Sequence, residues 1–148
     1  MLLDDRNDPA VADKYRQALA EGDYPADALC NLGILESSSG DKAKAFDCFT
    51  RSLRLEPRHF ESHYNLANLY FDTGDYQLAR NHYEFAREID PSYANLYYNL
   101  GLVMAMEKQY GAAIKNFNHY AEVVGGEEAE RTLELVSRIM GSVARDGT

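Results

Sequence analysis

Apolar side chains recur along this chain at the intervals of amphipathic helices, most regularly in the stretch 60–93. The first half of the stretch carries a set spaced at i, i+3, i+4 and i+7, which lies on one face of a helix. That set consists of His63, Leu66, Ala67 and Tyr70. The second half has a similar face, made of Ala79, Tyr83, Ala86 and Ile89. The pattern therefore predicts two helices in this stretch.

The polar positions between and after the two faces indicate where the helices end. Gly74 can adopt the left-handed backbone that ends a helix, and the Asp75 carboxylate can accept from the free N–H groups that open the next one. Pro91 has no N–H and disfavours a helical Asp90, so the second helix is expected to stop there. We therefore expect an antiparallel hairpin, with the small Ala79 where its helices approach closely.

The same pattern returns 34 residues earlier and 34 residues later. The matched sets are Leu32, Leu66 and Leu100; Gly33, Ala67 and Gly101; Ala45, Ala79 and Ala113; and Phe49, Tyr83 and Phe117. A unit of this length cannot bury its apolar face alone, so neighbouring units stack. The sequence predicts an all-α solenoid with three full repeats, over 26–59, 60–93 and 94–127.

One further helix is expected at each end of the array. Residues 8–25 predict a helix whose apolar positions match the second helix of a hairpin, which makes this segment half a repeat. Residues 127–143 predict a helix that caps the last hairpin, which has no following repeat to cover it. Its wide apolar arc consists of Leu133, Leu135, Val136, Ile139 and Met140. The whole chain, 1–148, is thus expected to be one domain of eight helices.

These residues resemble the tetratricopeptide repeat family. The family pattern of Trp-x2-Leu-Gly-x2-Tyr, Ala-x3-Phe and Pro is met in the central stretch by His63, Leu66, Ala67, Tyr70, Ala79, Tyr83 and Pro91. The copy over 26–59 departs mainly at Glu36, and the copy over 94–127 has Lys108-Gln109 in place of the Gly-Asp turn. The resemblance implies a right-handed superhelix whose concave groove binds an extended peptide.

Asparagines recur at the same interval, at Asn31, Asn65 and Asn99. In the family such asparagines hold the backbone of a bound peptide, since an amide offers both a donor and an acceptor. The alternative is that they are solvent-exposed or form hydrogen bonds between helices. The residues predicted to share the groove with them are Ile34, Tyr64, Asn68, Asn95, Tyr98 and Leu102. Some family members bind a C-terminal carboxylate with Lys and Arg, but the corresponding positions here are Cys30, Ile34, Asn95 and Asn99, so carboxylate binding is disfavoured. A groove with apolar, aromatic and acidic side chains instead suits a peptide with apolar and basic side chains.

Charge and composition narrow the possible partners. The formal net charge is −9 at pH 7, from 15 Lys and Arg against 24 Asp and Glu, and no basic stripe is present to bind nucleic acid. No apolar run is long enough to cross a membrane or to form a signal core, so we expect no membrane insertion and a cytoplasmic location. Cys30 and Cys48 lack the spacing of a metal site and are expected to be packing or groove residues, with no disulfide between them.

The sequence therefore predicts a non-enzymatic scaffold or adaptor with no catalytic residues, no metal and no cofactor. His59 and His63 lie four residues apart, but no acidic ligand is expected to complete a metal geometry around them. The alternative is a structural assembly or homo-oligomerisation module that uses its convex face or its terminal helix. A monomer is expected, and the alternative would be a dimer through a two-fold contact of Leu135 and Ile139.

Overall fold

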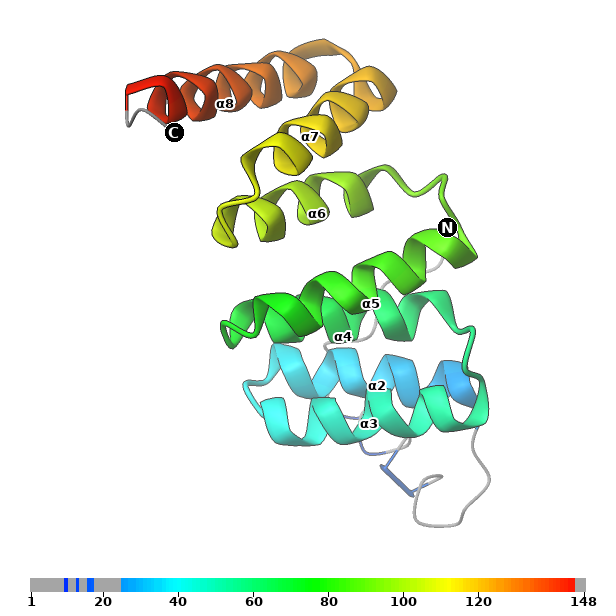
Figure 1. Cartoon of the computed structure of the whole chain (residues 1–148). Coiled ribbons are helices and arrows are strands. Elements are labelled where there is room, and N and C mark those ends of the chain that lie inside the picture. Colours follow the sequence, from blue (N-terminus) through cyan, green and yellow to red (C-terminus); the bar gives the residue numbers. More distant parts are fainter. Residues whose placement is uncertain (1–9, 11–12, 14–15, 18–24, 146–148) are drawn as a thin grey trace.

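The computed structural model describes residues 10, 13, 16, 17 and 25–145 of the chain. The helices in this part are α2 (Ala26–Ser38), α3 (Lys42–Leu55), α4 (Phe60–Asp72), α5 (Tyr76–Ile89), α6 (Ala94–Met106), α7 (Tyr110–Val124) and α8 (Gly126–Arg145) (Figure 1). These residues contain no strand, and the predicted all-α helical repeat fold is confirmed. The half-repeat predicted over 8–25 lies mostly outside the described residues. The single-domain organisation of 1–148 stays a prediction.

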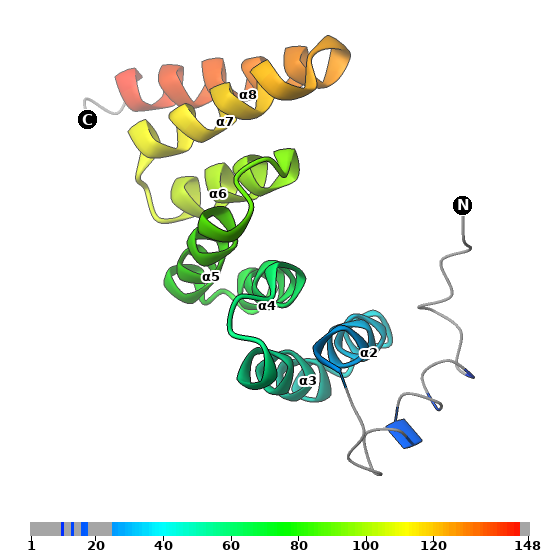
Figure 2. The same ribbon diagram turned by 90° about the vertical axis from the view of Figure 1, so that its right-hand side faces the viewer.

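The helices form consecutive antiparallel hairpins that stack on one another. Each helix contacts the next one along the chain, and α2 also contacts α4. Figure 2 shows that the stack is curved, with α2, α4 and α6 on its inner side. None of the helices in the described part of the chain is long and apolar enough to span a membrane.

Each hairpin turns at a residue with a positive φ. These residues are Gly40 (φ 91°), Gly74 (φ 84°) and Lys108 (φ 61°). Glycine adopts this left-handed conformation at little cost because it has no Cβ, whereas a lysine adopts it at a cost of about 1 kcal/mol. The left-handed end predicted at Gly74 is confirmed. The third hairpin makes the same turn without a glycine.

The capping role predicted for Asp75 is wrong. Asp75 is the N-cap residue of α5, but its side chain makes no capping hydrogen bond. Its carboxylate instead accepts from Thr73 Oγ1 at 3.0 Å, across the turn. Asp41 does cap its helix, because its carboxylate accepts from the Lys44 N–H at 3.0 Å.

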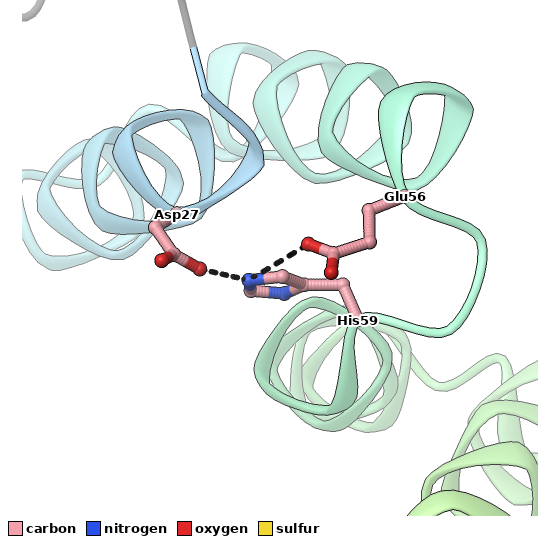
Figure 3. A group of neighbouring side chains, drawn as sticks. All are labelled: Asp27, Glu56 and His59. Atoms are coloured by element: carbon pink, nitrogen blue, oxygen red, sulfur yellow. Dashed lines mark hydrogen bonds and ion pairs between the residues drawn. The ribbon is translucent and has the colours of Figure 1, made fainter.

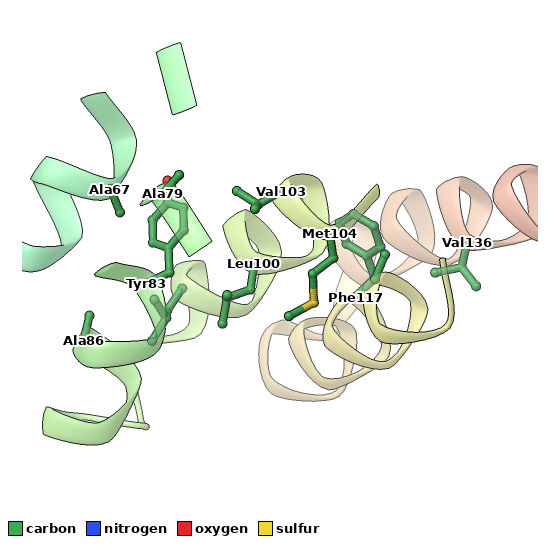
Figure 4. Close-up of a cluster of buried hydrophobic side chains, with 11 residues drawn as sticks. Ala67, Ala79, Tyr83, Ala86, Leu100, Val103, Met104, Phe117 and Val136 are labelled. Carbon is green, nitrogen blue, oxygen red and sulfur yellow. The ribbon is translucent and has the colours of Figure 1, made fainter. Parts of the chain in front are cut away.

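Small residues allow the paired helices to approach one another, and large ones fill the space beside them. Ala67 and Ala79 are both fully buried, as predicted. The larger of two core clusters joins the second hairpin to the third and to α8, and Figure 4 shows its buried members. The smaller cluster, between the first and second hairpins, consists of Cys30, Ala45, Phe49, Leu66 and Leu69. Cys30 and Cys48 are buried and form no disulfide.

Helix α8 packs against α7, with part of its predicted arc facing the array. Val136 is buried in the larger core cluster, and Leu135 and Ile139 are half-buried against it. Both residues thus pack partly within the chain, and the two-fold contact suggested for Leu135 and Ile139 stays a prediction. Leu133 and Met140 are 47% and 56% exposed and form the free apolar positions of the helix.

Candidate peptide-binding groove

The predicted asparagine row lies on the three helices at the inner side of the curve, one residue each on α2, α4 and α6 (Figure 2). Asn31, Asn65 and Asn99 are all half-buried, but the amides are not equivalent. The Asn65 amide nitrogen donates to the Glu61 carbonyl of its own helix at 2.8 Å. The Asn99 amide nitrogen donates instead to the Tyr64 hydroxyl at 2.8 Å, on a neighbouring hairpin.

Asn99 belongs to a polar network that joins α4, α5 and α6. Its amide nitrogen also lies 3.3 Å from the side-chain oxygen Oδ1 of Asn68, which accepts from the Tyr83 hydroxyl. Burial raises the pKa of Tyr64 to about 12 and also raises the pKa of Tyr83, so both phenols stay protonated at neutral pH. The Asn99 amide nitrogen therefore forms hydrogen bonds between helices, which was the alternative to peptide binding. No described residue donates to its side-chain oxygen, so that oxygen can still accept from a ligand.

Two pockets open on either side of this network. The first, which we call the inner pocket, has a volume of about 190 Å³ and lies between α4 and α6. It is lined by Asn68, Phe71, Asp72, Tyr83, Asn99 and Leu102. An apolar wall with one carboxylate and two amides can accommodate an apolar side chain and bond the adjoining peptide group.

The second pocket, which we call the edge pocket, has a volume of about 420 Å³ and lies where α4 begins. It is lined by Phe60, Glu61, Tyr64, Asn65, Asp90 and Tyr93. Tyr64 belongs to both features, since its ring lines the edge pocket while its hydroxyl accepts from Asn99. The two pockets are therefore neighbours along the same inner surface.

The structure gathers only some of the predicted groove residues. Asn68, Asn99 and Leu102 line the inner pocket, and Tyr64 and Asn65 line the edge pocket. The remaining four, Asn31, Ile34, Asn95 and Tyr98, line neither. Ile34 packs against the smaller core cluster and Tyr98 against Phe117, with ring centroids 5.5 Å apart, while Asn95 is exposed.

Sequence reasoning missed the aromatic and acidic half of the edge pocket. Phe60, Asp90 and Tyr93 were not predicted to be site residues, although they line this pocket. One signal was available, because Phe60 and Tyr64 stand four residues apart on one helix face. The contribution of Asp90 and Tyr93 comes from the loop between α5 and α6, whose path the repeat pattern does not give.

A second polar cluster joins the first hairpin to the second (Figure 3). His59 Nε2 lies 2.5 Å from an Asp27 carboxylate oxygen and 4.0 Å from one of Glu56. No acidic ligand was expected to complete a metal geometry around His59 and His63, but one ligand atom each of Asp27, Glu56 and His59 lie within 4.8 Å of one another, a grouping that could hold a metal ion. His59 Nδ1 accepts from the Ser62 N–H at 3.1 Å, which caps α4.

The tautomer of His59 indicates what this cluster does. A neutral imidazole whose Nδ1 accepts a hydrogen bond carries its proton on Nε2, and that proton points at Asp27. A metal ion would need the Nε2 lone pair, and the helix cap would then be lost. The geometry therefore favours a structural role, in which His59 caps α4 and ties it to α2.

Family models of the tetratricopeptide repeat match three overlapping parts of the chain. A model described as TPR repeat matches residues 67–108, and two described as tetratricopeptide repeat match residues 48–81 and 26–59. Together these matches span all three hairpins as far as the turn of the third.

Two known proteins are similar in sequence to part of this chain. The photosystem I assembly protein Ycf3 of Acaryochloris marina (strain MBIC 11017) is 28% identical over 106 residues, which is 70% of this chain and 53% of that protein. The protein O-mannosyl-transferase TMTC1 of Homo sapiens is 33% identical over 110 residues, which is 74% of this chain and 12% of that protein. The chain thus matches about half of the first relative and a small part of the second.

Among solved structures, the first TPR of Spaghetti (RPAP3) bound to the HSP90 peptide SRMEEVD has a similar fold. The TM-score is 0.72 at 22% sequence identity, and the superposition covers 80% of this chain and 93% of that one. At this level of identity the likeness concerns the fold alone.

Proposed function

Because the chain belongs to the tetratricopeptide repeat family, we propose that it is a non-enzymatic scaffold or adaptor that binds an extended segment of a partner protein on its inner surface. The observation that carries this proposal is the pair of neighbouring pockets on either side of the Tyr64–Asn99 hydrogen bond. An extended peptide presents alternate side chains to one face, so it can fill two such pockets and bond an amide between them. A cytoplasmic location is part of this proposal.

Side-chain burial has to supply most of the affinity. A hydrogen bond from a peptide group to an amide contributes about 0.5–1.5 kcal/mol net, whereas a micromolar complex needs about 8 kcal/mol. The apolar surfaces of Phe71 and Leu102 in the inner pocket, and the rings of the edge pocket, are the available sources. The binding segment is therefore expected to carry at least one apolar side chain.

The charges of the two pockets favour a basic segment. Glu61, Asp72 and Asp90 lie in their walls, and none of the described Lys or Arg side chains lines either pocket. The peptide in the RPAP3 structure, SRMEEVD, contains three acidic residues, and an acidic segment of that kind would meet like charges here. We expect selection of apolar and basic side chains instead.

A peptide-display selection tests this proposal. Random peptides are selected on the wild-type chain, and one selected peptide is then titrated against Leu102→Glu and Leu78→Glu by isothermal calorimetry. Leu102 lines the inner pocket, whereas Leu78 is 44% exposed on α5 outside both pockets, so the second variant is a matched control. We expect at least about tenfold weaker binding by Leu102→Glu only. Equal affinities for the two variants would place the binding surface elsewhere.

The exposed apolar residues of α8 support a second candidate function, self-assembly through the terminal helix. Leu133 and Met140 are the two exposed large apolar side chains of this helix, seven residues apart. Residues at that spacing share a helix face and can meet the same face of a second copy. Light scattering across a range of concentrations tests this candidate, since it requires a dimer.

A further inference from the structure

The edge pocket combines aromatic faces and carboxylates in a way that the inner pocket does not. The Phe60 and Tyr64 rings are nearly parallel, with centroids 6.0 Å apart and planes 8° apart. Tyr93 stands almost perpendicular to both, with its centroid 5.5 Å from that of Phe60 and 5.2 Å from that of Tyr64. The three rings therefore form a corner rather than a flat patch.

Two carboxylates lie in the wall of this corner, and one of them is held in place. Asp90 Oδ1 accepts from the Ser92 N–H at 3.0 Å and from the Ser92 hydroxyl at 2.6 Å. These bonds lower the pKa of Asp90, so it is ionised at neutral pH. Its second oxygen, Oδ2, has no partner among the described residues. Glu61, on the first turn of α4, adds a second acidic group.

We propose that the edge pocket is a binding site for a cationic side chain, lysine above all, carried by the peptide that occupies the groove. Aromatic faces attract a cation through their quadrupole, and the carboxylates add charge complementarity. A lysine can lay its apolar stem against the rings while its ammonium group reaches the oxygen atoms. The volume of about 420 Å³ leaves room for such a chain.

This inference deepens the proposed function and rests on it, because the cation is taken to belong to the groove-bound peptide. The pocket can nevertheless be tested without any peptide. The probes are Nα-acetyl-lysine methylamide, its Nε-acetylated form, which keeps the stem but has no charge, and its Nε-trimethylated form, which keeps the charge but has no N–H donor. Each is titrated at constant ionic strength while amide and tyrosine ring signals are followed by NMR.

The expected result is saturable binding of the lysine probe that shifts signals of residues 60–65 and 90–93. The Nε-acetylated probe is expected to bind at least about tenfold more weakly, because it loses both the cation–π and the ionic attraction. The trimethylated probe is expected to bind within about threefold of lysine, since attraction to an aromatic face needs no N–H group. Equal binding of the charged and acetylated probes would overturn the proposal, and so would loss of binding on trimethylation.

Substitutions assign the binding to this pocket. Glu61→Gln and Asp90→Asn keep size and remove one charge each, and each is expected to weaken lysine binding about two- to fivefold. Tyr93→Leu is expected to weaken it to a similar extent, with circular dichroism confirming an unchanged fold. Glu130→Gln is the matched control, because it removes one exposed charge on α8. If Glu130→Gln weakened lysine binding as much as Asp90→Asn, the binding would depend on the net charge of the protein and not on this pocket, and the proposal would be overturned.

Failure of this inference can be told apart from failure of the proposed function. Peptides that bind the wild type but not Leu102→Glu, and that tolerate replacement of every Lys and Arg by Gln, would keep the groove and overturn the cation site. If the peptide selection yields no binder while the lysine probe still binds to residues of the edge pocket, the cation site stands and the proposed groove fails.

Discussion

At the scale of single residues, the closest helix contacts in the array depend on glycines, which have no side chain. A Cβ added at Gly101 would lie 2.6 Å from a carbon of the Phe117 ring, and one added at Gly33 would lie 2.6 Å from the Phe49 ring. These distances are shorter than any ordinary carbon contact, so ring and helix would have to separate. The middle hairpin has Ala67 at the same position of its repeat, in one core cluster with Tyr83.

The first prediction uses two glycines of the third hairpin. Gly101→Ala is expected to lower the free energy of unfolding by about 1–2 kcal/mol, since overpacking outweighs the helix preference of alanine. Gly111→Ala is the control, because nothing lies within 4 Å of its added Cβ, and it is expected to be neutral or stabilising by up to about 1 kcal/mol. Urea unfolding measures both. A Gly101→Ala protein as stable as the wild type would show that the Phe117 ring can move aside without loss of stability.

The second prediction concerns His63 and His82, whose Nδ1 atoms lie 3.0 Å apart. His63 Nε2 donates to the Pro57 carbonyl at 2.8 Å, so a neutral His63 accepts at Nδ1 from His82. Burial, with the nearby His63, lowers the pKa of His82 to about 4, and burial also lowers the pKa of His63. Both side chains are therefore neutral in the folded protein at pH 7.

The sign of the pH effect follows from these shifts. An unfolded histidine has a pKa of about 6.5, so between about pH 6.5 and 4 the unfolded chain binds more protons than the folded one. Stability is therefore expected to fall as the pH falls through this window, by about 1 kcal/mol at pH 5 after allowance for solvent screening. Between pH 5 and 7, the melting temperature of His82→Gln should depend less steeply on pH than that of the wild type. An unchanged slope in His82→Gln would contradict the assignment.

At the scale of helices and turns, the third prediction concerns the only described non-glycine residue with positive φ, Lys108. Replacing it by glycine removes the steric cost of the left-handed conformation, so Lys108→Gly is expected to stabilise the protein by about 1 kcal/mol. Gly74→Ala is the reciprocal variant, since nothing crowds that position except its own backbone, and it is expected to destabilise by a similar amount. Thermal unfolding of the two variants should give shifts of opposite sign; shifts of the same sign would rule out this explanation.

The helices and turns were predictable because each is specified within a few residues of sequence. The apolar spacing and the breaks at Gly74 and Pro91 bracket α4 and α5 closely. Glu36, where the first repeat departs from the family pattern, depends instead on a residue far away in the sequence. Glu36 is buried, and its carboxylate accepts from Arg16 Nε at 2.8 Å, across 20 residues of sequence.

The candidate site was only partly predictable, because its contacts join different repeats. The 34-residue interval placed Asn99 on the inner surface, but its bond to Tyr64 depends on how closely two hairpins stack. The bond between His59 and Asp27 likewise crosses 32 residues. Periodicity predicts which face of a helix a residue occupies. Hydrogen-bond partners between neighbouring hairpins also depend on side-chain length and on the distance between the helices.

At the scale of the whole molecule, the array is finished at one end by α8. A stack of hairpins always leaves one apolar face that no further repeat covers. Here Val136, which is 6% exposed, shares a cluster with Met104 and Phe117 of the last hairpin (Figure 4). Thr132 is buried beside it and donates to the Glu128 carbonyl at 2.8 Å, so its hydroxyl costs little to bury. The side of α8 that carries Leu133 and Met140 remains open.

The last prediction separates a capping role of α8 from an assembly role. Truncation after Gly126 removes Val136 and the half-buried Leu135 and Ile139 from the core, so we expect a loss of at least about 2 kcal/mol and self-association through the uncovered surface. The full-length double variant Leu133→Glu and Met140→Glu changes only the open side, and it is expected to keep the wild-type melting temperature and mass in light scattering. If the wild type is a dimer that this variant dissociates, the open side is an assembly surface. A truncated chain that stays monomeric and as stable as the wild type would show that α8 does not cap the array, because exposing the surface beneath it would then cost no stability.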